Sequence, residues 1–238
     1  MVFPGLFLDM DECLRASSFS SSVSPARKPH FIALLTLPCY NGHKDSEEVL
    51  VAIESKLITY KDYLLLPELN RRYEIIDGEL QMTPSPTKRH QKLVLRIATL
   101  LESFVSERNL GEVLPAPMDV LIEKDPKLRT RQPDILYLSK KAGDISSDED
   151  SNFIVTAPNL VVEILSSSDS RRKIREKLND YHRIAISECW LVSPEAETVE
   201  VLDLPSDEIR TVALYSIGGH VNSKVLPGFS LSVNQIFR

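Results

Sequence analysis

The stretch NLVVEILSSSDSRRKIREKLNDY, residues 159–181, decides the fold of this chain. Its first half is a short run of branched apolar residues, which is typical of a buried strand. Its second half carries apolar side chains at helical spacing: Ile174, Leu178 and Tyr181. A strand followed by a helix with one apolar face predicts a layered fold in which helices cover a sheet. One residue breaks the apolar run, because Glu163 lies in the middle of the predicted strand.

A carboxylate in such a strand needs a physical reason. Burying an isolated charge is costly, so Glu163 must face solvent, be paired or hold a metal ion. A second acid, Asp134, opens another apolar strand in QPDILYLS, residues 132–139. If the two strands are neighbours, the two carboxylates lie at one edge of the sheet and repel each other unless a cation joins them. Oxygen ligands of this kind suit Mg²⁺ or Mn²⁺.

Lys177 supplies the opposite charge close to these acids. It lies three residues after Ile174 and four before Tyr181, so it borders the apolar face of the helix. Its long stem can carry the ammonium group to the sheet edge. Two metal-binding acids and a lysine near the attacking water are the parts that phosphodiester hydrolysis needs. Taken singly, each residue has a plainer interpretation as a solvated or salt-bridged side chain, and only the combination indicates a site.

Capping, turn and periodicity signals predict the other elements. Thr59 is a candidate N-cap of a short helix, Asp77-Gly78 favours a type I′ hairpin turn, and a long amphipathic helix within 87–111 is expected to stop at Gly111. The remaining predictions are a strand over 112–123, a strand over 132–139, a solvated acidic loop over 143–150, an Asp169 or Ser170 cap on the second helix, two strands within 188–204, and a hairpin-rich tail over 211–237. Strands predominate, which indicates a mixed α/β or α+β domain.

Composition excludes several classes of protein. The 238 residues carry a net charge of −6, so bulk charge does not drive nucleic-acid binding. A local basic cluster nevertheless occurs at Arg171, Arg172, Lys173 and Arg175. The three cysteines are far apart and lack the spacing of a zinc site or a disulfide framework, which favours a reducing, cytoplasmic location. No run of about 18 apolar residues occurs, so we expect no membrane span.

Residues 1–55 differ from the rest of the chain. The Ser-rich, basic stretch 16–30 lacks a hydrophobic period, and Asp9 and Glu12 precede it, against the acid-poor composition of transit peptides. We expect residues 1–55 to be a disordered extension or an over-extended gene start. Residues 56–238 are predicted to form the folded domain.

Several motifs, taken in their order and spacing, give a resemblance to a known family. They are YEIIDGEL at 73–80, HQKLVLRIATLL at 90–101, Pro133-Asp134, Pro158, Glu163, Ser166, Lys177, Tyr181, Trp190 and LPGFSLSVNQIF at 226–237. From about Tyr60 to Phe237 the chain resembles the Uma-type restriction endonucleases, a bacterial branch of the PD-(D/E)XK nuclease superfamily. The resemblance implies an α/β, restriction-endonuclease-like core: a central mixed β-sheet flanked by helices, with C-terminal β-hairpin elements. It also implies a Mg²⁺- or Mn²⁺-dependent endonuclease that hydrolyses DNA.

The resemblance also implies roles for individual residues. Asp134, Glu163 and the main-chain carbonyl of Ile164 would hold the metal ion. The superfamily often has a lysine two residues after the acid, where this chain has Leu165, so Lys177 of the following helix takes that role. Glu74 would be the additional acid from an early element, with an exposed strand residue as the plainer alternative.

Two further residues each have two interpretations. His90 contacts phosphate or supports a ligand, or else it is an ordinary helix-surface histidine. Ser166 hydrogen-bonds an active-site carboxylate, or it caps the next helix. The family's usual Ser-Pro-Ser turn is Ser-Ser-Ser here, from Ser166 to Ser168, and the usual glycine before Trp190 is absent. Neither departure removes a ligand.

Other classes of function stay open at this point. A non-catalytic DNA- or partner-binding module on the same fold predicts salt-sensitive DNA association without strand cleavage. A purely structural interaction protein is supported only by the fold's tolerance for varied roles. The sequence leaves open which DNA sequence or structure is cut, whether RNA is accepted, and whether the protein forms a homodimer, which would suit double-strand cleavage.

Overall fold

The computed structural model describes residues 57–66, 72–140, 153–204 and 208–238, together with two short strands that precede them. The chain divides into two units, Met1–Lys56 and Leu57–Arg238. In the first unit, β1 (Ala33–Leu34) pairs antiparallel with β2 (Leu50–Val51). The other predictions for residues 1–55, and the acidic loop at 143–150, lie outside the described residues. Within the described segments, none of the helices combines the length and hydrophobicity needed to cross a membrane.

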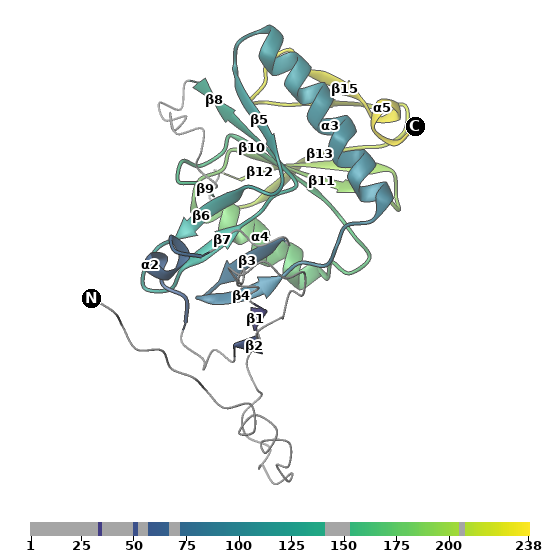
Figure 1. Cartoon of the computed structure of the whole chain (residues 1–238). Coiled ribbons are helices and arrows are strands. Elements are labelled where there is room, and N and C mark those ends of the chain that lie inside the picture. Colours follow the sequence, from purple (N-terminus) through teal and green to yellow (C-terminus); the bar gives the residue numbers. More distant parts are fainter. Residues whose placement is uncertain (1–32, 35–49, 52–56, 67–71, 141–152, 205–207) are drawn as a thin grey trace, which may run out of the picture. The chain divides into compact units, whose positions relative to one another are not determined.

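The second unit is built on a mixed sheet of six strands (Figure 1). In spatial order they are β13 (Arg210–Tyr215), β12 (Thr198–Asp203), β11 (Glu188–Ser193), β10 (Leu160–Ile164), β8 (Ile135–Ser139) and β5 (Gly111–Pro115). Strands β10 and β11 are parallel, and the other neighbouring strands in this sheet are antiparallel. The predicted α/β class with a central mixed sheet is confirmed.

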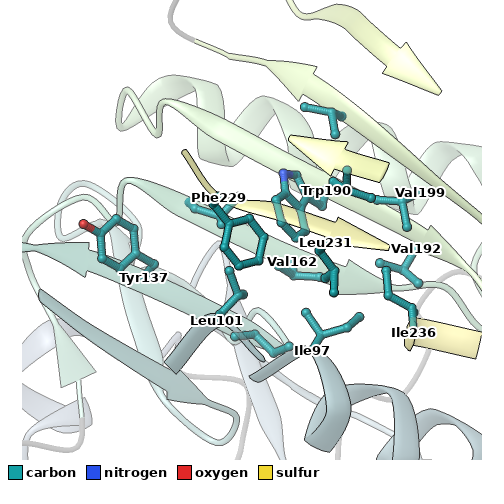
Figure 2. Packing of buried hydrophobic residues seen from close by; sticks show 14 of the residues in the cluster. Ile97, Leu101, Tyr137, Val162, Trp190, Val192, Val199, Phe229, Leu231 and Ile236 are labelled. Atoms are coloured by element: carbon teal, nitrogen blue, oxygen red, sulfur yellow. The ribbon is translucent and has the colours of Figure 1, made fainter. Parts of the chain in front are cut away.

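Alternating side chains in β10 divide the core into two layers. Val162 belongs to the cluster under α3 (Lys88–Glu107), whereas Val161 belongs to the cluster under α4 (Arg171–Arg183). The first cluster also contains Ile97, Leu101, Trp190, Phe229 and Leu231, which pack together in Figure 2. The second contains the predicted apolar face of α4: Ile174, Leu178 and the buried Tyr181. The two long helices therefore cover opposite faces of the sheet.

Smaller elements surround this core. They are α2 (Tyr60–Tyr63), β3 (Tyr73–Ile76), β4 (Glu79–Met82), β6 (Asp119–Glu123), β7 (Arg129–Arg131), β9 (Phe153–Ile154), β14 (His220–Asn222), β15 (Ser230–Ser232) and α5 (Val233–Phe237). Strands β6, β7 and β9 form a separate three-stranded sheet, and β14 pairs with β15 in the predicted C-terminal hairpin.

The local signals for caps and for the first hairpin are confirmed. Thr59 forms a capping box with Asp62 at the start of α2, and the Ser170 side chain accepts from the Lys173 N–H at the start of α4. Strands β3 and β4 are joined by Asp77 and Gly78, whose φ angles of 54° and 81° are the pair of positive values that a type I′ turn requires. The hairpin therefore follows from the dipeptide alone.

The single strand predicted over 112–123 is wrong. This segment forms two strands in different sheets, β5 ending at Pro115 and β6 beginning at Asp119, with a cis Ala116–Pro117 peptide bond between them. Proline has no N–H to donate to a ladder, so the two prolines end the pairing of β5. Strand β7 was not predicted, because its three buried residues, Arg-Thr-Arg, contain no apolar side chain.

The helix stop predicted at Gly111 is also wrong. Helix α3 ends at Glu107, and Asn109 adopts the left-handed φ of 52° that follows it. Gly111 instead begins β5, where a Cβ would lie 1.9 Å from the carbonyl oxygen of Leu138. The close approach of β5 to β8 is what requires a glycine at this position.

Candidate active site

The sheet brings the two predicted acids together. Strand β10 runs antiparallel to β8 with Val162 opposite Ile135, so the same register puts Glu163 beside Asp134. Both acids face the α4 side of the sheet, because Val162 and Ile135 next to them face the α3 side. Asp134 is 4% exposed and Glu163 is 7% exposed. Two carboxylates are thus buried side by side at the ends of two central strands.

Asp134 is held by three donors. Arg72 Nη1 donates to Oδ1 over 2.9 Å, while Oδ2 lies 3.1 Å from His90 Nε2 and accepts from the Ile164 N–H over 2.9 Å. Burial raises the pKa of Asp134, but His90, Arg72 and the Ile164 N–H outweigh burial and hold that pKa below its usual value. Asp134 is therefore an ionised carboxylate fixed in one orientation.

Glu163 has a different electrostatic environment. The Tyr181 hydroxyl donates to its Oε1, and Lys177 Nζ lies 2.9 Å from its Oε2. Burial and the charge of Asp134 nevertheless raise the pKa of Glu163 above its usual value, against the opposing effect of Lys177. The raised pKa of Glu163 reflects two buried carboxylates that lie close together. An additional cation beside both would stabilise their ionised forms.

Lys177 lies between Glu163 and Glu74. Its Nζ is 2.9 Å from Glu163 Oε2 and 3.6 Å from Glu74 Oε1. Burial lowers the pKa of Lys177, but the charges of these two acids outweigh burial and raise that pKa above its usual value. Lys177 is therefore protonated at neutral pH.

Glu74 connects this lysine to strand β7. Its side chain is 12% exposed, and its Oε2 accepts from Arg131 Nη1 over 2.9 Å. Burial raises the pKa of Glu74, but Lys177 and Arg131 outweigh burial and hold the pKa below its usual value. Glu74 therefore stays charged and restrains the Lys177 ammonium beside Glu163.

A buried ionic group fixes the helix that carries Lys177. Asp180 accepts from Arg131 Nε over 2.7 Å and from Arg129 Nη1 over 3.0 Å, and Glu176 Oε1 lies 3.3 Å from Arg131 Nη2. Only 5% of the Arg131 side chain and 3% of the Asp180 side chain are exposed. We call Arg129, Arg131 and Asp180 the β7–α4 clasp. It anchors the middle of α4 and so sets the position of Lys177.

A pocket of about 340 Å³ opens over the acid pair. Its charged and polar lining includes Arg72, Glu74, His90, Asp134, Glu163 and Lys177. The connection from β4 to α3, the turn from β10 to α4 and the first turns of α4 form its walls. Five of the seven predicted site residues thus line this pocket with their side chains: Glu74, His90, Asp134, Glu163 and Lys177. Arg72, which was not predicted, lines it as well. Ile164 and Ser166 complete the predicted set in the lining.

The two remaining predicted residues have specific contacts. The backbone N–H of Ile164 is bonded to Asp134, and the role of its carbonyl as a ligand stays a prediction. Ser166 donates its hydroxyl to Asp169 Oδ2 over 2.7 Å, and Ser170 rather than Ser166 is the N-cap of α4. Both interpretations of Ser166 are therefore wrong: Ser170 caps α4, and the Ser166 hydroxyl bonds Asp169 in place of an active-site carboxylate. Its hydroxyl orders the turn that forms one wall of the pocket.

The donor set at the acid pair fits a divalent cation. Among the described residues, no group of three or more His, Cys, Asp and Glu side chains is arranged to hold a metal ion. A cation here would therefore be held by Asp134 and Glu163, with the Ile164 carbonyl and water as further ligands. These donors are all oxygens, which Mg²⁺ and Mn²⁺ prefer.

Three contributors were missed by the sequence analysis. Tyr181 was predicted as part of the apolar face of α4 and as one of the family motifs, but its contact with Glu163 was not predicted. A buried tyrosine hydroxyl usually requires a partner, and this signal could have indicated a polar contact. Arg72 and the β7–α4 clasp had no usable signal. Their contacts join residues about 50 to 60 positions apart in the sequence. In addition, charged residues in a short segment such as β7 ordinarily indicate a solvated loop.

Comparisons with known proteins agree with this architecture. The family model described as "Uma2: Putative restriction endonuclease" matches residues 60–234. The fold is similar to a crystal structure described as "a putative nuclease belonging to DUF820 from Anabaena variabilis ATCC 29413", with a TM-score of 0.63 and 22% sequence identity. The match covers 76% of this chain and 97% of that one, and at this identity it shows a shared fold alone. No curated protein sequence matches the chain.

Proposed function

This chain belongs to the Uma2 family, and we propose that it is a divalent-metal-dependent endonuclease that hydrolyses phosphodiester bonds in DNA. Family membership and the nuclease-like fold support a nuclease function. Restriction-endonuclease-like families generally use divalent metal ions. The observation that carries the proposal is the pair of buried acids, Asp134 and Glu163, lying under a pocket with a protonated lysine beside them.

Each side chain has a role that follows from its contacts. A Mg²⁺ or Mn²⁺ ion bound at the acid pair supplies positive charge beside the phosphate and makes nearby water more acidic. Asp134 and Glu163 bind that ion, and His90 keeps the Asp134 carboxylate in its orientation. Because its pKa is raised, Lys177 acts through its charge, by orienting the attacking water or by stabilising the negative charge that develops on phosphate.

Charge near the pocket supports a nucleic-acid substrate. Between Gln81 and Leu101 the chain carries basic residues and no acid, and four of the first five residues of α4 are basic while none is acidic. The exposed basic residues in these two segments are Lys88, Arg89, Lys92, Arg171, Arg172, Lys173 and Arg175. Both segments contribute to the pocket wall, in a protein whose net charge is −6. Of these seven residues Lys173 lines the pocket itself, and the positive charge of the two segments favours a polyanion that extends beyond the pocket.

Cleavage of supercoiled plasmid tests the proposal. We expect purified protein to convert the plasmid to nicked or linear DNA with Mg²⁺ or Mn²⁺ and to leave it intact in EDTA. Asp134→Asn should be at least about 100-fold slower, because it removes a metal-binding charge, and Glu112→Gln on the exposed face of β5 should match the wild type. Cleavage in EDTA, or full activity of Asp134→Asn, would contradict the proposal. A parallel assay on single-stranded RNA decides whether DNA is the preferred substrate.

One observation favours a second function, a DNA-binding module without catalysis. All four oxygens of the acid pair already have protein partners, namely Arg72, His90 and the Ile164 N–H on Asp134, and Tyr181 and Lys177 on Glu163. Such a network can serve structure alone. This function predicts salt-sensitive binding of plasmid DNA with no strand cleavage in either metal, which the same samples would reveal in a gel-shift assay.

A further inference from the structure

Arg72 makes a contact that the proposed reaction does not yet use. Its Nη1 lies 2.9 Å from Asp134 Oδ1, its Nη2 donates to the Gln132 carbonyl over 2.8 Å, and its Nε lies 3.5 Å from Gln132 Oε1. The Arg72 side chain lines the pocket and is 20% exposed, whereas the Asp134 side chain is 5% exposed. The guanidinium group is therefore bonded to the buried acid, and the Arg72 side chain borders the same pocket.

This placement conflicts with a cation at the acid pair. Arg72 and a divalent ion would both carry positive charge at the same carboxylate, where low exposure strengthens their repulsion. His90 and the Ile164 N–H bind the other oxygen of Asp134, so Arg72 is the donor that competes at Oδ1. A ligand that must displace an internal ion pair is weakened by the free energy of that pair.

Resting on the function proposed above, we infer that Arg72 competes with the metal ion for Asp134 and, once displaced, binds the phosphate of the substrate. The bond from Nη2 to the Gln132 carbonyl anchors one side of the guanidinium, so that Nη1 can move from Asp134 toward the pocket without losing its anchor. A guanidinium presents parallel N–H groups that match two phosphate oxygens. Arg72 thus compensates the charge of Asp134 in the metal-free protein and that of the phosphate in the loaded one.

Two measurements on Arg72→Met test both halves of this inference. Removing the competitor should tighten Mn²⁺ binding about tenfold or more in calorimetry. The substitution removes the charge-assisted bond from Arg72 to Asp134, which stabilises only the metal-free state, so the metal ion no longer has to displace it. Removing the phosphate-binding group should slow plasmid cleavage at saturating Mn²⁺ about 100-fold. Tighter metal binding together with slower cleavage is a combination that a merely structural arginine does not produce.

Three further variants keep the result interpretable. Arg72→Gln tests the same point with a side chain that can still bond Gln132, in case the methionine variant fails to fold. Arg72→Lys keeps the positive charge and should bind Mn²⁺ much as the wild type does. Arg210→Met removes an exposed cation of β13, outside the pocket lining, and should change neither quantity.

The outcomes separate this inference from the proposed function. Weaker or unchanged Mn²⁺ binding by Arg72→Met and Arg72→Gln overturns the competition, even if the wild type cleaves DNA. An unchanged cleavage rate at saturating Mn²⁺ overturns the phosphate role. If the wild type itself neither binds Mn²⁺ nor cleaves DNA, the proposed function fails and this inference fails with it.

Discussion

A Lys177→Met variant is expected to cleave plasmid DNA about 100- to 1,000-fold more slowly than the wild type at saturating metal. The reason is electrostatic. Glu163 and Glu74 hold the positively charged Lys177 ammonium beside the acid pair, with Nζ 2.9 Å from Glu163 Oε2. The loss should appear mainly in kcat, because a group that acts on developing charge contributes little to substrate binding. Single-turnover cleavage with Mg²⁺ measures it.

Lys173→Met is the matched control for this prediction. Lys173 lies one turn earlier on α4, also lines the pocket and is exposed, so its substitution should lower the rate only by weakening attraction to the DNA backbone. The loss at Lys173 should therefore vanish at low salt, whereas the loss at Lys177 should persist. Lys177→Arg should regain part of the rate because it restores the charge. Equal rates for Lys177→Met and the wild type would rule out the assigned role.

The second large effect is on stability. Arg131→Met should lower the free energy of unfolding by about 3–5 kcal/mol, because it leaves Asp180 and Glu74 with one cation fewer in places where side chains are only 3% and 12% exposed. Equilibrium urea unfolding in EDTA measures this loss without a contribution from bound metal. The variant should also lose cleavage activity, since the β7–α4 clasp sets the position of α4 and hence of Lys177.

Arg183→Met provides the comparison for Arg131. Arg183 is the last residue of α4 and pairs with Glu123, but 54% of its side chain is exposed, so its removal should cost at most about 1 kcal/mol. A further variant, Arg131→Met combined with Asp180→Leu, should recover part of the stability because it removes the buried charge of Asp180. The recovery stays partial because Glu74 still lacks Arg131. A loss below about 1 kcal/mol for Arg131→Met alone would mean that the clasp contributes little.

The sequence predicted those parts of the site that depend on regular spacing. Glu163 was detectable because a charge inside an apolar strand is costly, and Lys177 because helical spacing placed it at the border of the apolar face. The type I′ turn at Asp77-Gly78 followed from local backbone preference, which no distant residue overrides. Each of these signals lies within a few residues of the position it describes.

The rest depends on contacts between distant segments. Arg72 reaches Asp134 because the β3–β4 hairpin lies beside β7, and this arrangement leaves no periodic pattern in the sequence. Strand β7 was missed because Arg129 and Arg131 are buried in ion pairs with an acid on α4, which reverses the usual relation between charge and exposure. The prediction of a helix stop at Gly111 was wrong because this glycine is required by its close approach to the backbone of β8. That approach is a tertiary contact, which no local sequence pattern indicates.

Mn²⁺ binding by the purified protein, followed by calorimetry for the wild type and for Glu163→Gln, tests the central claim most directly. The substitution keeps the size of the side chain but removes the charge that, with Asp134, would hold the ion. We expect one Mn²⁺ per wild-type chain and an affinity about 100-fold or more lower in Glu163→Gln, since even supporting residues of metal sites cost about 10- to 100-fold. Glu123→Gln, outside the pocket, should bind as the wild type does. Equal affinity for Glu163→Gln and the wild type would contradict a metal site at the acid pair.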